Sequence, residues 1–131
     1  MTKYFSTADF VALAEVSWAF LTDDGFGQPE VQGRRLVYRS DDLTVEALFD
    51  DRDGRIEMRV GGAVGERRPR AGLSCLYTTA RIGPAQEIAD IGRTERQLRL
   101  ALESHATALR AVLPHLRGPR RDELLISCHG R

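Results

Sequence analysis

Residues 34–61, RRLVYRSDDLTVEALFDDRDGRIEMRVG, contain three short segments in which apolar and polar residues alternate. Alternation with a period of two is typical of β-strands that have one face in the core and the other in solvent. The segments are separated by residues 40–42 and 50–54, which are rich in turn-forming Ser, Asp and Gly. The pattern predicts strands at about 34–40, 43–50 and 55–61, joined as an antiparallel meander.

An amphipathic helix is predicted before this meander, at about residues 7–22. Ser6 and Asp9 have the spacing of a capping box. Apolar residues from Phe10 to Leu21 then recur at the three- and four-residue intervals of one helical face. Trp18 is expected at the edge of that face, with its indole N–H in water.

A second, longer helix is predicted at about residues 95–116. Thr94 and Gln97 form a second capping box, and Pro114 should kink or end the helix because its ring clashes with the preceding turn. The apolar face of this helix consists of Leu98, Leu102, His105, Leu109, Val112 and Leu116.

The rest of the chain gives weaker signals. Residues 61–72 are predicted to form an exposed basic loop. Residues 73–82 favour a fourth strand, because Thr, Tyr and Ile are common in strands. Residues 124–126 fit a short terminal strand or a docked turn. Together these features predict one α+β domain over residues 1–131, an antiparallel sheet of three to five strands with both helices packed on one face.

Composition bounds the function. The 131 residues have a formal net charge of zero, so no overall field attracts nucleic acid or a membrane. Residues 1–54 carry a net charge of −6 (11 acidic, 5 basic), and residues 55–131 carry one of +6 (8 acidic, 14 basic). If the two halves segregate in space, the protein has an acidic and a basic pole; if they interleave, the two charges cancel. The N-terminus lacks the pattern of a signal peptide, and two cysteines without a spacing motif fit a reducing compartment. A cytoplasmic protein is expected.

No sequence motif indicates a metal, a cofactor or catalysis. Residues 49–60 lack the acidic first and last ligands of a calcium-binding loop. The glycines at 61–65 lack the order and the following Lys of a phosphate-binding loop. Residues 72–76 lack the last Gly of a nucleophile elbow. We therefore expect no metal and no cofactor, and a non-enzymatic protein is favoured.

His105 is the strongest single candidate for a functional residue. A histidine on the buried face of a helix is usually a core residue bonded to a carbonyl or a carboxylate, and that interpretation is favoured. The alternative is a ligand-binding or catalytic pocket between the sheet and the last helix. Such a pocket would be built around His105, with Tyr38, Tyr77 or Cys75 nearby; Cys75 could act as a nucleophile with a histidine as its base, although an inert buried thiol is commoner.

Two clusters of arginine offer a third interpretation. They could hold the phosphates of a nucleic acid, but no aromatic residues lie between them to stack on bases. Solvated loops are therefore favoured, and a protein with an acidic surface is a second use for the same charges. The clusters comprise Arg67, Arg68 and Arg70, and Arg117, Arg120 and Arg121.

Several of these segments resemble those of a group of proteins. Phe20-Leu21-x₄-Phe26, followed by residues 37–40, 43–46 and 50–54, resembles small uncharacterised proteins of GC-rich, actinobacterial-type genomes. Some of those proteins are suspected immunity partners of secreted toxins. The resemblance implies a non-enzymatic, immunity-like module whose partner is another protein, and it transfers no catalytic residue. A monomer and a homodimer both remain open.

Overall fold

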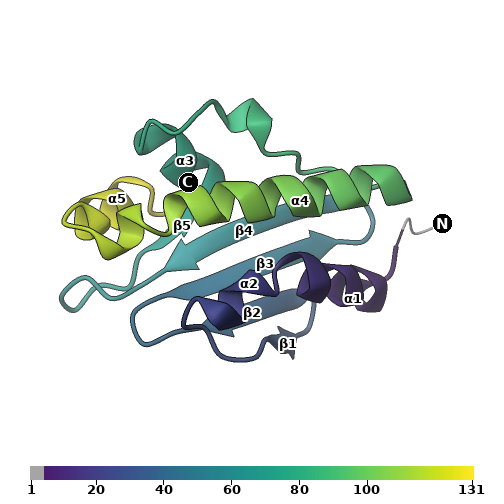
Figure 1. Cartoon of the computed structure of the whole chain (residues 1–131), viewed down its shortest axis with the longest axis horizontal. Helices are drawn as coiled ribbons and strands as arrows, with labels where there is room; N and C mark the ends of the chain where they lie inside the picture. Colours follow the sequence, from purple (N-terminus) through teal and green to yellow (C-terminus); the bar gives the residue numbers. More distant parts are fainter. Residues whose placement is uncertain (1–4) are drawn as a thin grey trace.

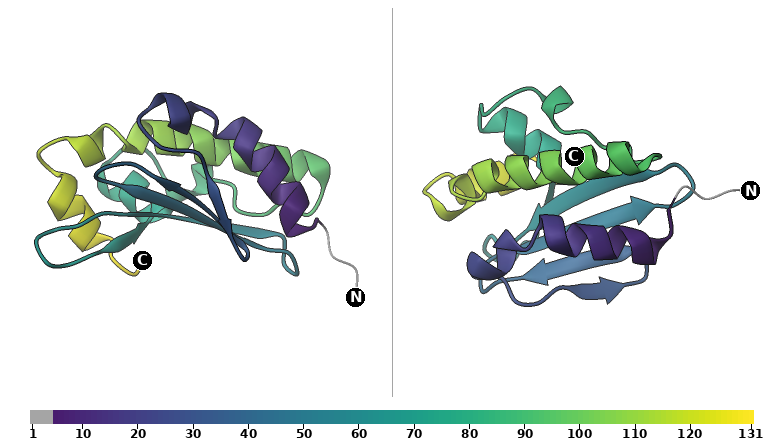
Figure 2. Two further views of the ribbon diagram at one scale, coloured as in Figure 1. Left: turned by 90° about the horizontal axis from the view of Figure 1, so that it is seen from below. Right: turned by 45° about the vertical axis from the view of Figure 1, so that its right-hand side comes forward.

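The computed structural model of the protein describes residues 5–131. It confirms the α+β class: one antiparallel sheet carries helices on one face (Figures 1 and 2). In chain order the elements are α1 (Thr7–Ser17), α2 (Phe20–Asp23), β1 (Glu30–Gln32), β2 (Arg35–Arg39), β3 (Thr44–Asp50), β4 (Arg55–Gly61), β5 (Arg70–Gly72), α3 (Leu73–Thr79), the 3₁₀ turn η1 (Ala85–Glu87), α4 (Glu95–Val112), the 3₁₀ turn η2 (His115–Arg117) and α5 (Arg121–Ser127).

The sheet is a simple meander whose spatial order, β1-β2-β3-β4-β5, follows the chain. The predicted alternation sets its two faces. Leu36, Ala47 and Met58 lie opposite one another on the covered face, whereas Val37, Glu46 and Arg59 do so on the open face. Figure 1 shows α1 and α4 lying across the covered face, and the left view of Figure 2 shows the other face free of helices.

The core lies between this face and the helices. The six residues of the apolar face predicted at 95–116, which we call the helical seam, are each at most 3 % exposed, including His105. The covered-face residues of β3 and β4 are buried equally well. Both capping boxes, Ser6 with Asp9 and Thr94 with Gln97, are formed. The α4 helix ends at Val112, just before Pro114, as the proline predicts.

The first helix differs from the prediction because it is broken at Trp18. The Trp18 backbone leaves the helical region (φ −109°, ψ 19°), so the single helix expected at 7–22 is instead α1 and α2. The predicted wet indole is also wrong: the side chain is fully buried, and its Nε1–H donates to the Leu102 carbonyl at 3.0 Å. This hydrogen bond joins the end of α1 to the middle of α4.

The strand predicted at 73–82 is wrong, since residues 73–79 form α3. Leu73, Leu76, Tyr77 and Ala80 are buried at the i, i+3, i+4, i+7 spacing of a helix. The β-branched Thr78 is tolerated there because its hydroxyl bonds to carbonyls one turn earlier, at 3.1 Å. Helical periodicity was thus present in the sequence and outweighs the strand propensity.

Three short elements were not predicted. β1 adds an edge strand beside β2, and β5 occupies the end of the segment expected to be a loop. The rest of that segment is a hairpin that turns at Gly65, whose φ of +61° suits glycine. Residues 121–127 form the helix α5 rather than a strand or an isolated turn. The two three-residue strands, β1 and β5, carry too little periodicity for their type to be read.

The oppositely charged halves of the chain interleave, so the two poles do not form. Arg117 pairs with Asp24 at 2.9 Å, and Arg70 pairs with Glu46. Each of these ion pairs joins the basic half of the chain to the acidic half. Over residues 5–131, we find no helix with the length and apolar character required to cross a bilayer.

Candidate functional site

His105 is almost completely buried but has one ring nitrogen free for a ligand. Its Nδ1 lies 2.8 Å from the Ala101 carbonyl, and because a carbonyl can only accept, Nδ1 carries the proton. Burial, the largest influence, lowers the pKa of His105, so the ring is neutral near pH 7. Nε2 is then an acceptor, and it has no hydrogen-bond partner in the described part of the chain.

A cavity of about 440 Å³ lies beside His105, at an interruption in the edge of the sheet. β5 pairs with β4 only at Arg59–Gly61. At the other end of β4, the Ile56 N–H donates to the Asp90 carbonyl at 2.8 Å. On the edge of β4 that faces away from β3, no strand within residues 5–131 pairs with the intervening Glu57 and Met58. The cavity occupies this gap, between β4, the start of α3, the segment around η1, and α4.

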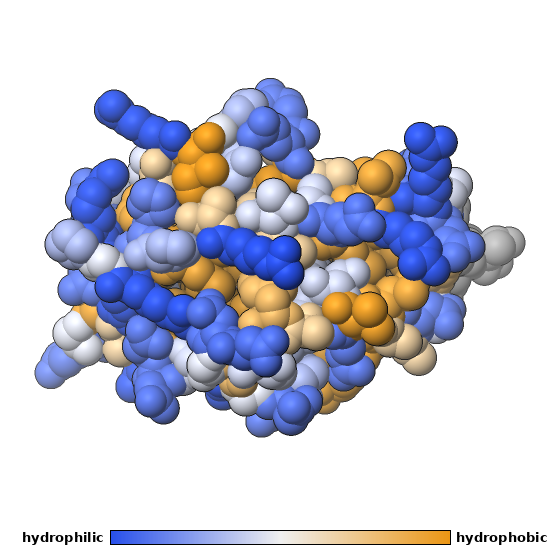
Figure 3. Space-filling model, viewed as in Figure 1, coloured by the Kyte–Doolittle hydropathy of each residue, from blue (hydrophilic) through white to orange (hydrophobic). Residues whose placement is uncertain are grey.

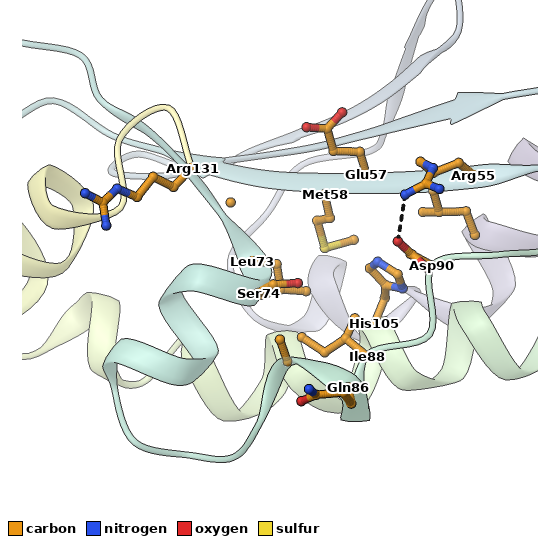
Figure 4. A pocket seen from close by; sticks show the side chains of 13 residues that line it. Arg55, Glu57, Met58, Leu73, Ser74, Gln86, Ile88, Asp90, His105 and Arg131 are labelled. Atoms are coloured by element: carbon orange, nitrogen blue, oxygen red, sulfur yellow. Dashed lines mark hydrogen bonds and ion pairs between the residues drawn. The ribbon is translucent and has the colours of Figure 1, made fainter. Parts of the chain in front are cut away.

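The cavity has apolar walls and a charged rim. Figure 4 shows the His105 ring rising from α4 toward Met58 and Asp90, with Ile88 beside it. At the rim, Arg55 and Asp90 form an ion pair at 3.3 Å, and both side chains are more than half exposed. The lining thus combines apolar side chains with several polar and charged ones, and such a concave site can hold a small molecule that has both kinds of group.

The geometry suits binding better than catalysis. Among the described residues, the hydrogen-bond partner of the His105 ring is a backbone carbonyl, and Asp90, whose negative charge acts on the ring, is engaged by Arg55. Among the described residues, no hydroxyl or thiol lies within hydrogen-bond distance of the ring. Its Nε2 can accept a hydrogen bond from a ligand, but the residues around it do not form a nucleophile–base pair.

The structure separates His105 from the three residues predicted to accompany it. Tyr38, Tyr77 and Cys75 do not line the cavity. The Tyr77 hydroxyl donates to the Glu87 carboxylate at 2.7 Å, and this hydrogen bond, with burial second, raises the pKa of Tyr77. This hydrogen bond links α3 to η1, and neither Tyr77 nor Glu87 lines the His105 cavity.

Tyr38 lies on the covered face of β2, at a different cavity. Its side chain is 2 % exposed, and its hydroxyl has no hydrogen-bond partner among residues 5–131. Burial, and secondly the negative charge of Glu15, raise the pKa of Tyr38 to about 12, so the phenol stays protonated.

The two cysteines are joined, contrary to the expectation of reduced thiols. Cys75 in α3 and Cys128 after α5 form a disulfide, with their Cα atoms 5.6 Å apart. The bond removes the thiolate that a nucleophilic Cys75 would need. It was not predicted because 53 positions separate the two residues, and only the packing of α3 against α5 brings them together.

The two arginine clusters meet only in part. Arg68, Arg70 and Arg121 line a common surface cavity, where Arg121 donates to the Ala63 carbonyl of the β4–β5 hairpin at 2.9 Å. Four of the six arginines form ion pairs with acids, which leaves little free charge for phosphates. Arg67 and Arg68 are the two without an acidic partner among the described residues.

Sequence reasoning missed the other wall of the His105 cavity. Arg55 was predicted only as a strand residue, and no functional role was predicted for Ile88 or Asp90, because a cavity edge made by irregular backbone leaves no periodic signal. No feature of the sequence indicates that Asp90 pairs with Arg55, because this pairing depends on how the chain returns to β4 near Ile91.

No protein-family model, curated protein or solved structure matches the chain. The site geometry is therefore the basis for the function proposed below.

Proposed function

We propose that this chain is a non-enzymatic binding protein that holds a small, largely apolar molecule in the His105 cavity. The observation that carries the proposal is the Nε2 atom of His105, an acceptor without a protein partner among residues 5–131, in a side chain that borders a cavity of about 440 Å³. Because Nε2 is not sealed by the protein around it, a ligand in the cavity can donate a hydrogen bond to it.

The same atom defines the ligand's chemistry. Because the ring is neutral and protonated on Nδ1, the ligand must offer a hydrogen-bond donor, such as a hydroxyl or an amine N–H, to Nε2. Met58, Leu73 and Ile88 would cover its apolar part. The Arg55–Asp90 pair at the rim suits a polar substituent that points toward solvent.

A pair of probes of equal shape tests this proposal. p-Cresol and p-xylene differ by one hydroxyl, and NMR titration of the protein should show saturable binding of p-cresol about tenfold tighter. His105→Phe, which keeps a planar ring but removes Nε2, should erase that preference. His115→Phe is the control, since His115 lies outside the cavity. Equal binding of both probes, or an unchanged preference in His105→Phe, would exclude the proposal.

A second candidate function is protein binding, of the immunity-like kind. It is favoured by the open face of the sheet, where the half-buried Leu48 lies among charged side chains, and by the adjoining hairpin with Arg67 and Arg68. These two arginines suit a partner with an acidic surface. We expect the product of a neighbouring gene to bind the purified protein, with an affinity that falls as the salt concentration rises. The Arg67→Glu, Arg68→Glu double variant should lower that affinity further. Binding that is indifferent to both changes would count against this surface.

The cytoplasmic location also stays a proposal, and the disulfide provides its test. The glutathione and thioredoxin of the cytoplasm keep most cysteines reduced. Cys128 is fully buried, so intact cells should be quenched with acid and the unfolded chain then alkylated, which should label both Cys75 and Cys128. Recovery of the chain unlabelled would place it in an oxidising compartment instead.

A further inference from the structure

A second cavity, separate from that of His105, lies beneath α1 and α2 at the β1 side of the sheet. It has a volume of about 170 Å³, and the Tyr38 side chain lines it from below. The Tyr38 hydroxyl is buried without a hydrogen-bond partner among residues 5–131. A buried phenol oxygen usually has such a partner, so the group is prepared for something that the chain itself does not supply.

The other groups around this cavity are mainly acceptors. Glu15 is the one charged side chain among its lining residues, and no cation within residues 5–131 forms an ion pair with it. The Thr22 hydroxyl already donates to the Ala19 carbonyl at 2.8 Å, so toward a ligand its oxygen can only accept. Gln28 adds an amide oxygen. In a protein of zero net charge, this is a small negative site surrounded by oxygen atoms.

We infer that the Tyr38–Glu15 cavity binds a primary ammonium group. An ammonium has three N–H donors and no acceptor, which matches the Glu15 carboxylate, the Tyr38 oxygen and a third oxygen from Thr22 or Gln28. A guanidinium could pair two N–H groups with the Glu15 carboxylate, but it is planar and wider than an ammonium, so it suits three separate oxygens around a small cavity less well. The volume accommodates the ammonium and a few methylene groups.

The ammonium could belong to a free alkylamine or to a lysine of another protein, and the probes distinguish the two. n-Butylammonium chloride and Nα-acetyl-lysine N-methylamide are titrated into the protein, with n-butanol as the uncharged probe of similar shape. Amide shifts at Glu15, Ala19, Thr22 and Tyr38 report binding. We expect saturable binding of n-butylammonium, at least about tenfold tighter than n-butanol. Binding of the capped lysine as well would identify a protein side chain as a competent ligand.

Variants establish that the two side chains are responsible. Glu15→Gln and Tyr38→Phe should each weaken n-butylammonium binding by about tenfold. Glu15 is exposed, so Glu15→Gln should leave the fold intact, and the equally exposed Glu103 of α4 provides the matched control Glu103→Gln. The inference is wrong if n-butylammonium causes no saturable shift, as a cavity holding only water would give, or if Glu15→Gln binds as tightly as the wild type.

Discussion

Reduction of the Cys75–Cys128 disulfide should cost the protein much of its stability. The bond links residues 53 positions apart, and breaking it lets the unfolded chain explore conformations that the closed loop forbids. For a loop of this length, the chain-entropy relation gives about 4 kcal/mol. This is a large share of the roughly 5–15 kcal/mol that stabilises an ordinary domain.

Urea unfolding with and without a dithiol reductant measures this effect without changing any side chain. The midpoint should fall in reductant, and the slope should rise as the unfolded chain expands. Cys75→Ala, Cys128→Ala and the double variant should lose similar amounts, because either substitution opens the same loop. The reasoning fails if reductant leaves the midpoint unchanged, or if the double variant loses the sum of the two single losses.

Three further changes test individual contacts. Tyr38→Phe removes a hydroxyl without a partner and should raise the unfolding free energy by about 1 kcal/mol in urea titrations; a clear loss would reveal a bonded hydroxyl. Trp18→Phe removes the hydrogen bond to the Leu102 carbonyl and should cost about 2 kcal/mol, measured by circular dichroism; an unchanged midpoint would show that this bond does not join the helices. Burial lowers the pKa of His105 below its ordinary 6.5, so below that pH the unfolded chain binds more protons than the native one. Stability should therefore fall as pH drops through that range, and His105→Gln should show a smaller slope; equal slopes would contradict the burial.

The long elements could be predicted because each repeats its signal several times. In β3 and in β4, three apolar residues at alternate positions occupy the covered face, which leaves the register little freedom. In α4, five buried residues of the predicted apolar face and a capping box agree with one another. The helical seam is buried within the chain, so packing against the sheet accounts for it without a second copy.

The candidate site was predicted only in its central residue. His105 stood out because a titratable side chain interrupts an otherwise apolar seam, and the structure places it on a cavity wall. Tyr38, Tyr77 and Cys75 could not be assigned to that wall, because their positions depend on which end of the sheet each segment reaches. Tyr77 and Cys75 were also taken as strand residues, an error that misplaces every side chain of α3.

Both cavities have the same structural origin. The long elements, α1, α4, β3 and β4, cover one another with apolar side chains and leave few polar atoms unpaired. The His105 cavity opens because β5, three residues long, pairs with only the Arg59–Gly61 part of the β4 edge. The Tyr38 cavity opens where α1 breaks and the four-residue α2 leads toward the short edge strand β1. Short elements cannot cover a sheet edge completely, so buried polar groups meet empty space there. The two proposed sites therefore lie where side chains of well-predicted elements, such as His105 of α4 and Tyr38 of β2, border segments whose sequence signal is weakest.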